Sequence, residues 1–269
     1  MQKISGKEVS GEIIEKLKTK KTPDKILGAI LIGEDPTSIS FLKQKEKIAK
    51  DLGIDFRLYN FSESIKNDDL RKEINKLARS KRIGGLILQL PLPKGVNKNY
   101  VLNAIPREKD VDVLSERALG AFYKGRNLVS PPSVGVVEEI IERLDLKLEK
   151  LTVVVVGLGD LVGKPISVWL TDKCRNLHLL RSGSDLEIIK GADLIISGVG
   201  KAGVVKEINL RDGSGVIDFG YYYTPNGQLL GDFEKDKKSD KVLFYTPTPG
   251  GTGPILVAKL MENFYKLNA

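Results

Sequence analysis

The chain has 269 residues, of which 41% are hydrophobic and 29% are charged, and its formal net charge is +8. This composition is ordinary for a soluble globular protein, and the length allows one large domain or two smaller ones. The positive charge favours anionic ligands, but the lysines are spread along the whole chain without a basic block or interleaved aromatic residues, which argues against a nucleic-acid partner.

The counts of cysteine and histidine restrict the chemistry. The only cysteine is Cys174, which excludes an internal disulfide and fits a reducing compartment. With His178 as the only histidine, a zinc site and a Ser-His-Asp or Cys-His catalytic centre are not expected. The N-terminal stretch has the pattern of an amphipathic helix without the apolar core of a secretion signal, and no apolar run reaches the roughly 18 residues of a membrane span. We therefore expect a cytoplasmic protein with no membrane partner.

Short apolar runs alternate with helical patterns in the first half of the chain. Residues 26–33 and 84–93 are apolar without strict alternation, which predicts two buried parallel strands. Between them, helices are predicted over about 37–52 and 67–80. Two prolines and two serines interrupt the pattern over residues 128–135, and we place a domain boundary there.

The second half of the chain continues the alternation. A helix is predicted over 134–146, followed by strands at 151–157, 176–180, 192–200 and 215–220. The whole series predicts an α/β protein in which helices cover both faces of parallel sheets. Asn226 and Gly227, between short β-prone runs, predict a type I′ hairpin turn. The exposed edge of such a hairpin would suit a dimer contact.

Lys45 stands out on the predicted helix 37–52, for which Asp35 is the expected N-cap and Pro36 the first helical residue. At about 100° per residue, Lys45 falls inside the apolar stripe, while the other lysines of the helix fall on the opposite face. A partly buried ammonium pairs with a carboxylate or has a lowered pKa, and it can then transfer protons near neutral pH. The alternative is an apolar stem that only carries the charge past the core to water.

Further polar residues occupy positions where strands are predicted to end. Gln89 interrupts an apolar strand beside a proline-rich turn, at the carboxyl end where ligand sites of α/β sheets collect. A purely structural role in backbone hydrogen bonding is the alternative. Asp110 and Asp112 alternate with valines, so both can point the same way from an extended segment. One would pair with a cation, and the other would hold a polar substrate.

The segment VVVVGLGDLVGKP (153–165) leads from a predicted strand into a glycine-rich turn. Gly157 and Gly159 lie two residues apart, but Gly163 follows four residues after Gly159, one more than the dinucleotide fingerprint has. The spacing alone leaves open a cofactor site or a simple turn.

Seven stretches of the chain form an ordered set: GEDPTSISFLKQKEKIAKDLGI, GGLILQLPLP, KDVD, VVVVGLGDLVGKP, SGVGKAG, VIDFG and TPTPGGTGP. In this order they resemble the bifunctional methylenetetrahydrofolate dehydrogenase/methenyltetrahydrofolate cyclohydrolase family over nearly the whole chain. The resemblance implies a catalytic domain over 1–132 that the C-terminal helix 252–269 completes, a Rossmann-type cofactor domain over 133–251, and a substrate cleft between the two. It also implies tetrahydrofolate one-carbon derivatives as substrates and a homodimer formed through the cofactor domain.

The resemblance also implies site residues. Lys45 matches the catalytic lysine, Gln89 the glutamine that positions it, and Asp112 the aspartate that holds the pterin ring. The substrate-binding residues that it implies are Phe41, Leu88, Gln89, Leu90, Asp112, Pro249, Gly250, Gly251, Gly253 and Pro254. The cofactor-binding residues that it implies are Gly157, Leu158, Gly159, Gly163, Arg181, Ser182 and Tyr221.

The residues after the predicted strand 176–180 bear on the choice of cofactor. Rossmann sites place an acidic residue on the ribose of NAD and a basic residue on the 2′-phosphate of NADP. Arg181, Ser182 and Ser184 suit the phosphate. Asp185 is the opposing signal, which we interpret as the cap of the following helix. We therefore expect NADP rather than NAD, and a structural role for His178 in its strand.

Five positions depart from the family pattern: Phe41 replaces a tyrosine, Val113 a glycine, Gly159 a serine and Leu256 a threonine, and Pro132 lies in an altered proline junction. All lie near the expected ligand sites, so they bear on affinity and on the balance between the two activities. A monofunctional dehydrogenase with weak or no cyclohydrolase and a non-catalytic nucleotide-binding relative are the alternatives. A Rossmann oxidoreductase for a shikimate-like or amino-acid substrate would leave the proline- and glycine-rich stretches unexplained.

Overall fold

The computed structural model describes residues 1–236 and 238–269, and these form two compact units. Unit 1 comprises Met1–Gly11 and Ser133–Leu256, and unit 2 comprises Glu12–Pro132 and Val257–Ala269. Two helices, α1 (Gly6–Lys18) and α8 (Thr252–Leu267), contribute residues to both units. In the described part of the chain, no helix is long and apolar enough to cross a membrane.

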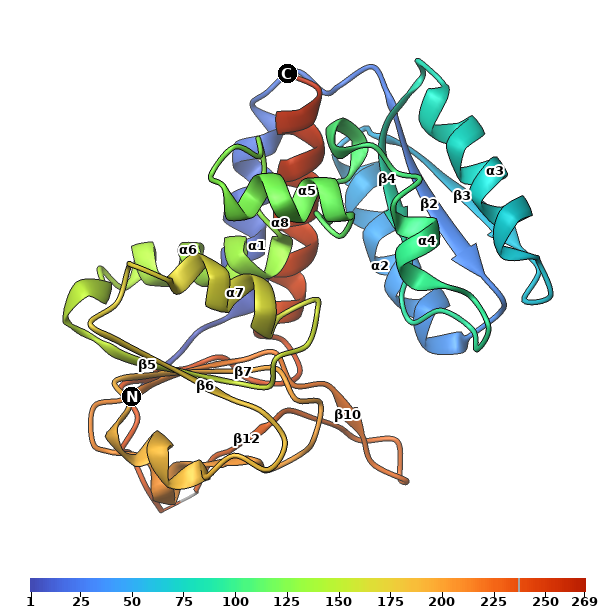
Figure 1. Cartoon of the computed structure of the whole chain (residues 1–269). Helices are drawn as coiled ribbons and strands as arrows, with labels where there is room; N and C mark the ends of the chain where they lie inside the picture. Colours follow the sequence, from blue (N-terminus) through green and yellow to red (C-terminus); the bar gives the residue numbers. More distant parts are fainter. Residues whose placement is uncertain (237) are drawn as a thin grey trace. The chain divides into compact units, whose positions relative to one another are not determined.

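Unit 2 is built on a three-stranded parallel sheet in the order β3-β2-β4. The central strand β2 (Ile26–Ile32) is buried along its whole length, as is β4 (Ile83–Leu88), whereas the edge strand β3 (Asp55–Phe61) contains no buried residue. Helix α2 (Pro36–Asp51) covers one face of the sheet, and α3 (Asn67–Arg79) and α4 (Lys98–Leu102) cover the other (Figure 1). The helix α5 (Glu116–Tyr123) and the short 3-10 helix η1 (Arg107–Lys109) complete the unit.

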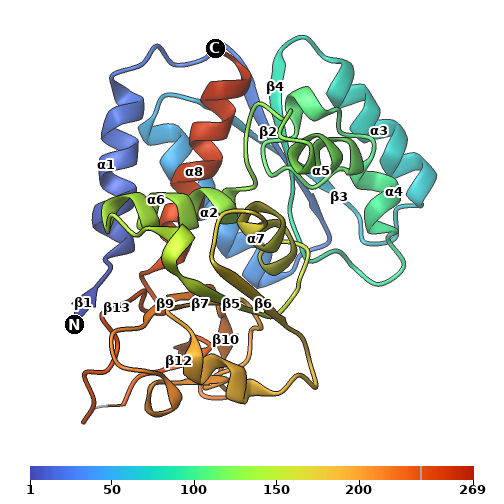
Figure 2. The ribbon, with the colours of Figure 1, turned by 60° about the vertical axis from the view of Figure 1, so that its left-hand side comes forward.

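Unit 1 contains a six-stranded parallel sheet in the order β1-β13-β9-β7-β5-β6. Its strands are β1 (Gln2–Lys3), β13 (Phe244–Tyr245), β9 (Gly215–Asp218), β7 (Leu194–Ser197), β5 (Thr152–Val156) and β6 (Asn176–Leu180). Helices α6 (Pro132–Arg143) and α7 (Gly163–Leu170) lie on one face, and the strand β12 (Phe233–Glu234) lies on the other (Figure 2). Chain order reverses beside β5, because β6 lies on one side of it and β7 on the other, which is the topological switch point of a doubly wound sheet.

Shorter elements connect these layers. They are η2 (Leu148–Lys150), η3 (Leu186–Gly191), β8 (Val205–Lys206), η4 (Glu207–Asn209), β10 (Tyr222–Tyr223) and β11 (Leu229–Leu230). Strand β8 pairs in parallel with β12, and β10 pairs in antiparallel with β11.

The predicted α/β fold, its parallel strands and its main helices are confirmed. Strand β3 was not predicted, because its apolar residues are half-buried or, for Leu58, exposed at the edge of the sheet. The strand expected over 84–93 ends at Leu88, so Gln89 follows it. The structure groups Met1–Gly11 with unit 1, because β1 extends the sheet of that unit by pairing with β13; the predicted division assigned these residues to the catalytic domain.

The predicted hairpin is present, but its type I′ turn is wrong. The Thr224 amide donates to the Gln228 carbonyl at 2.9 Å and the Gly227 amide to the Thr224 carbonyl at 2.9 Å, which leaves three residues in the loop. Of these, only Gly227 has a positive φ, at 77°. Pro225 has its φ fixed near −65°, which suits the second position of a type I turn, and a left-handed glycine then completes the loop.

Candidate functional site

Lys45 lies on α2, the helix that follows the central strand of unit 2. As predicted, Asp35 caps this helix by accepting a hydrogen bond from the Ser38 amide at 2.7 Å, and Pro36 is its first residue. The cap fixes where the helix starts and therefore which side chains face the sheet. Lys45 is half-buried, whereas Lys43 and Lys47 on the same helix are exposed, so the charge does lie within the apolar stripe.

Gln89 meets Lys45 from the carboxyl end of β4. The Lys45 Nζ donates to the Gln89 Oε1 at 3.0 Å. The Gln89 side chain is 6% exposed, and its amide nitrogen donates to the Leu90 carbonyl at 2.6 Å. Its backbone amide donates to the Ile30 carbonyl of β2 at 2.9 Å, which continues the sheet by one residue. The amide side chain is therefore held on both sides, with its oxygen directed at the ammonium.

The electrostatics of Lys45 and Asp112 are coupled. Burial lowers the pKa of Lys45 below its ordinary value, and the neighbouring Asp112 carboxylate opposes this shift. Burial raises the pKa of Asp112 to about 6, against the opposing charge of Lys45 and with the like charge of Asp110. Groups whose pKa moves from opposite sides toward neutrality suit proton transfer, and such groups gather at active sites.

Asp110 has a different role from Asp112. It is 2% exposed, and its Oδ2 accepts hydrogen bonds from the amides of Leu114 at 3.0 Å and Ser115 at 2.7 Å. Residue 110 also forms an isolated parallel bridge with Leu86 of β4, which places this segment along the strand that ends at Gln89. Asp112 interacts electrostatically with Lys45, whereas Asp110 organises the backbone that follows it.

Val113 is the residue that follows Asp112, and its backbone is strained. Its φ is +56°, in the left-handed region that a β-branched residue rarely adopts, and its side chain is fully buried against Ala118 and Val129. The family pattern has glycine here, which adopts such a φ at no steric cost. The sequence identified Val113 as a departure from the family pattern, and its positive φ explains why the family has glycine at this position.

The other predicted folate residues occupy varied environments. Phe41 lies on α2 one turn before Lys45 and is half-buried, as is Leu90. Leu88 is 2% exposed and belongs to the core between the sheet and α3. Its side chain is therefore part of the packing.

The predicted glycine-rich segment 249–254 lies in unit 1 and leads into α8. Gly250 has a φ of +93°, and its carbonyl accepts the Gly6 amide at 2.8 Å. A Cβ on Gly251 would lie 2.4 Å from the Pro247 carbonyl oxygen, so only glycine fits there. Gly253 and Pro254 belong to the first turn of α8.

The turn after β5 depends on two of its three glycines. Gly157 has a φ of +89°, and a Cβ on it would lie 2.8 Å from the Gly198 carbonyl oxygen. A Cβ on Gly163 would lie 1.8 Å from the Gly157 carbonyl oxygen. Gly159 is exposed, has no positive φ and has open space where its Cβ would be. The interval that matters is therefore Gly157 to Gly163, where strand and helix backbones touch, while Leu158 and Gly159 form the tip of the turn.

Arg181 and Ser182 follow β6 and are both exposed. The Arg181 amide donates to the Ser184 Oγ at 3.0 Å. Asp185 accepts a hydrogen bond from the Glu187 amide at 2.9 Å and is the N-cap of η3, which confirms its predicted capping role. His178 lies within β6 and is exposed.

Tyr221 precedes β10 and belongs to an exposed run of three tyrosines. Its hydroxyl donates to the Tyr223 hydroxyl at 3.0 Å, and the two rings meet edge to face with centroids 5.3 Å apart. Burial and this hydrogen bond raise the pKa of Tyr221 to about 12, so the hydroxyl stays protonated at neutral pH.

Sequence reasoning missed a pair of buried carboxylates in unit 1. Asp218 ends β9 and is 1% exposed, and Asp232 follows β11 and is fully buried. Burial raises the pKa of Asp218 to about 6, against hydrogen bonds from the Phe233 and Gly220 amides. An aspartate closing the apolar run of VIDFG was the available signal.

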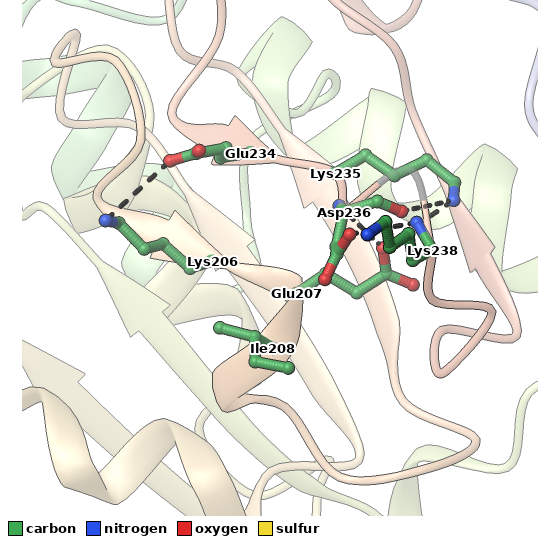
Figure 3. A pocket seen from close by; sticks show the side chains of 7 residues that line it. All are labelled: Lys206, Glu207, Ile208, Glu234, Lys235, Asp236 and Lys238. Atoms are coloured by element: carbon green, nitrogen blue, oxygen red, sulfur yellow. Dashed lines mark hydrogen bonds and ion pairs between the residues drawn. The ribbon is translucent and has the colours of Figure 1, made fainter.

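A separate hollow of unit 1 has a cavity volume of about 490 Å³ (Figure 3). Its charged side chains pair with one another: the Lys206 Nζ lies 3.9 Å from the Glu234 Oε2, and the Lys235 Nζ lies 3.6 Å from the Glu207 Oε2. None of the predicted site residues lines it.

Comparison with known proteins identifies the family. The model described as the catalytic domain of tetrahydrofolate dehydrogenase/cyclohydrolase matches residues 4–112, and the model of the NAD(P)-binding domain of the same family matches residues 131–269. The bifunctional protein FolD of Clostridium perfringens is 33% identical over 271 residues, covering 98% of each chain.

Solved structures agree with these matches. The bifunctional FolD of Campylobacter jejuni superposes with a TM-score of 0.93 at 30% identity, over 98% of this chain and 97% of that one. The Trypanosoma brucei methylenetetrahydrofolate dehydrogenase-cyclohydrolase, complexed with NADP and an inhibitor, gives a TM-score of 0.91 at 25% identity, over 98% and 96% of the two chains. The chain thus belongs to the tetrahydrofolate dehydrogenase/cyclohydrolase family and carries both its catalytic and its NAD(P)-binding domain.

Proposed function

We propose that this chain oxidises 5,10-methylenetetrahydrofolate to 5,10-methenyltetrahydrofolate with NADP and hydrolyses the product to 10-formyltetrahydrofolate, as an enzyme of one-carbon metabolism. The observation that carries the proposal is the 3.0 Å hydrogen bond between the Lys45 ammonium and the Gln89 amide oxygen. In a chain of this family, it joins a lysine of lowered pKa to a polar side chain at the carboxyl end of a parallel strand.

Lys45 is the proton-transferring group in this proposal. Water adds to the methenyl carbon, and the neutral amine of Lys45 takes the proton that the water loses. The bond between that carbon and N5 then breaks: the ammonium returns a proton to the departing nitrogen, while the hydroxyl on the carbon loses its proton to water and becomes the formyl C=O. A lysine with a pKa closer to neutral serves both steps better than an exposed one, and Gln89 keeps its Nζ in one place.

Asp112, in its ionised form, would hold the pterin ring by accepting hydrogen bonds from the ring nitrogens. Phe41 offers an aromatic face for stacking, without the hydroxyl that the family usually has. Leu88 and Leu90, together with Pro249, Gly250, Gly251, Gly253 and Pro254, complete the proposed folate site. Most of these residues belong to the proposed catalytic domain 1–132 with the helix 252–269, whereas Pro249, Gly250 and Gly251 belong to the proposed cofactor domain 133–251.

The residues of unit 1 fit a dinucleotide. The missing Cβ of Gly163 lets the amino end of α7 lie directly against the Gly157 backbone in the turn, and anionic groups bind at such helix ends. NADP supplies the hydride acceptor when it is bound, and the protein supplies alignment. Leu158 and Gly159 would lie along the pyrophosphate, Arg181 and Ser182 would hold the 2′-phosphate, and Tyr221 would close the site. Capping by Asp185 removes the main argument for NAD, since its carboxylate is engaged by η3.

We also propose that the chain forms a homodimer. The exposed tyrosines and the paired strands β10 and β11 offer an apolar edge in the proposed cofactor domain 133–251, which suits a homodimer contact. We further propose that the enzyme is cytoplasmic.

The test uses purified protein with 5,10-methylenetetrahydrofolate and either NADP or NAD, following reduced nicotinamide and methenyl absorbance together. We expect turnover with NADP to exceed turnover with NAD, and no turnover with either would contradict the enzyme proposal. Lys45→Met should remove the hydrolytic step, while Lys43→Met on the exposed face of the same helix should leave it intact. Formation of 10-formyl product by Lys45→Met at the parent rate would disprove the role of Lys45 and favour hydrolysis elsewhere.

A further inference from the structure

The Asp232 carboxylate holds the segment that follows β7. Its Oδ2 accepts hydrogen bonds from the Ser197 Oγ at 2.7 Å and the Val199 amide at 2.6 Å, and its Oδ1 accepts from the Lys201 amide at 2.8 Å. Asp232 is fully buried, as is Ser197. Three donors on one buried carboxyl group, at 2.6 to 2.8 Å, fix the backbone from Ser197 to Lys201 in one conformation.

The held segment touches the glycine turn directly. The Gly198 amide donates to the Val156 carbonyl at 2.9 Å, at the end of β5. Any Cβ on Gly157 would lie 2.8 Å from the Gly198 carbonyl oxygen, and any Cβ on Gly198 would lie 2.7 Å from the Val162 side chain. Segment 197–201 and the turn therefore pack without spare room at the switch point beside β5, where α/β sheets bind their ligands.

Asp232 is itself held in place by Asp218. The Asp218 Oδ1 accepts from the Gly220 amide at 2.6 Å and the Asp232 amide at 3.2 Å, and its Oδ2 accepts from the Phe233 amide at 3.0 Å. Both ends of the segment that contains β10 and β11 are thus tied to the end of β9. The side chain of Asp232 reaches from this fixed backbone to segment 197–201.

We propose that Asp232 is a positioning residue for the dinucleotide: its carboxylate fixes segment 197–201 in the conformation that receives NADP beside the glycine turn. The inference rests on the proposed function and adds to it a residue that affects the cofactor indirectly, through segment 197–201. When the carboxylate is replaced, at least one part-buried amide of this segment loses its partner. The segment then relaxes, and the glycine turn loses the backbone against which it packs.

Three variants test this. In Asp232→Asn one oxygen becomes a donor, so it faces either the Val199 or the Lys201 amide without accepting from it. Ser197→Ala removes one hydrogen bond and leaves both amides paired. The matched control is Asp193→Asn at the opposite end of β7, where the carboxylate accepts from the Thr152 amide at 2.7 Å and from the Arg211 Nη1 at 2.6 Å. This control perturbs the same strand without touching segment 197–201.

The readouts are the Kd for NADP from calorimetry, the increase in melting temperature with NADP, and KM against kcat for NADP in the dehydrogenase assay. We expect Kd and KM to rise about tenfold or more in Asp232→Asn and about threefold in Ser197→Ala, with less than a twofold change in Asp193→Asn. At saturating NADP, kcat should stay within about twofold of the parent in every variant that binds.

Parent-like NADP affinity in both Asp232→Asn and Ser197→Ala would overturn the inference, as would an equal loss in Asp193→Asn. If Asp232→Asn does not fold, the comparison of Ser197→Ala with Asp193→Asn decides the question alone. Failure of the proposed function would appear differently: the parent protein itself would neither bind NADP nor hydrolyse methenyltetrahydrofolate supplied without cofactor.

Discussion

The Lys45 centre of unit 2 and the glycine turn of unit 1 are built in opposite ways. At Lys45, the proposed chemistry depends on side chains: the Gln89 amide, and the Lys45 ammonium and Asp112 carboxylate, whose pKa values are shifted by burial. At the turn, the proposed cofactor binding depends on missing side chains, because the backbones at Gly157 and Gly163 approach too closely for a Cβ. A substitution at the Lys45 centre therefore changes its chemistry, whereas a substitution at the glycine turn changes its shape.

This difference makes the two regions unequally tolerant. A side chain at the Lys45 centre can be replaced while the fold stays, so its variants should be folded proteins with altered rates and pH profiles. A side chain added at the turn has nowhere to go unless strand and helix separate. The two kinds of site can therefore be told apart by whether stability or kinetics responds.

The largest effect is expected for Gly163→Ala. Its Cβ would lie 1.8 Å from the Gly157 carbonyl oxygen, so β5 and α7 must move apart. We expect a loss of several kcal/mol of stability, the range of severe overpacking, and loss of NADP binding. Gly159→Ala is the matched control, because its Cβ meets open space. Thermal melting with and without NADP measures both, and equal melting temperatures for the two variants would contradict the shape argument.

Asp112 should set the acidic limb of the pH profile. Its pKa is raised to about 6, so the carboxylate that we propose to hold the pterin ring becomes protonated as pH falls through 6. We expect kcat/KM for the folate to decline about tenfold per pH unit below this point, since one proton is taken up. Asp112→Asn should have a low rate without this limb. A parent profile that stays flat between pH 7 and pH 5 would contradict the assignment.

The same shift affects stability with a definite sign. The pKa of Asp112 lies above the ordinary value of 3.8, so the folded protein binds the proton more tightly than the unfolded chain does. This contribution is present at low pH and is lost as pH rises from about 4 to about 6. The free energy of unfolding should decline less over this window in Asp112→Asn than in the parent.

A smaller effect is expected at Val113, where strain and burial compete. Val113→Ala loses about 2 kcal/mol of buried side chain and keeps the φ of +56°. Val113→Gly loses more side chain but relieves a strain of about 1–3 kcal/mol. We expect the glycine variant to be at least as stable as the alanine variant, which is the reverse of the usual order. Urea denaturation of the pair measures this, and a glycine variant less stable by 1 kcal/mol or more would show that the backbone is not strained.

Candidate site residues could be predicted from the sequence where a local pattern indicates which side chains are buried. Lys45 was found because helical periodicity separates it from Lys43 and Lys47, and Gln89 because it breaks an apolar strand. The link between Asp232 and Ser197 could not be read in this way, because it joins residues 35 positions apart across the strands of unit 1. Nor could the conformation of Val113, which is set by the packing of the segment around Asp110. The predicted type I′ turn was wrong for a local reason: Pro225 has its φ fixed near −65°, and of the three loop residues only Gly227 has a positive φ.

The smallest effect is expected for Gly159→Ser, which restores the residue usual in the family. Gly159 has no positive φ and open space around its absent Cβ, so serine should fit without strain. A hydroxyl at the tip of the turn would give the pyrophosphate one more donor, and a single such hydrogen bond contributes about 1 kcal/mol. We expect the Kd for NADP to fall about fivefold at an unchanged melting temperature of the free protein. Gly159→Ala separates the hydroxyl from the backbone, because alanine stiffens the turn equally without a donor. If alanine tightens binding as much as serine does, the gain comes from chain rigidity, and the tip of the turn acts by its shape, as Gly157 and Gly163 do.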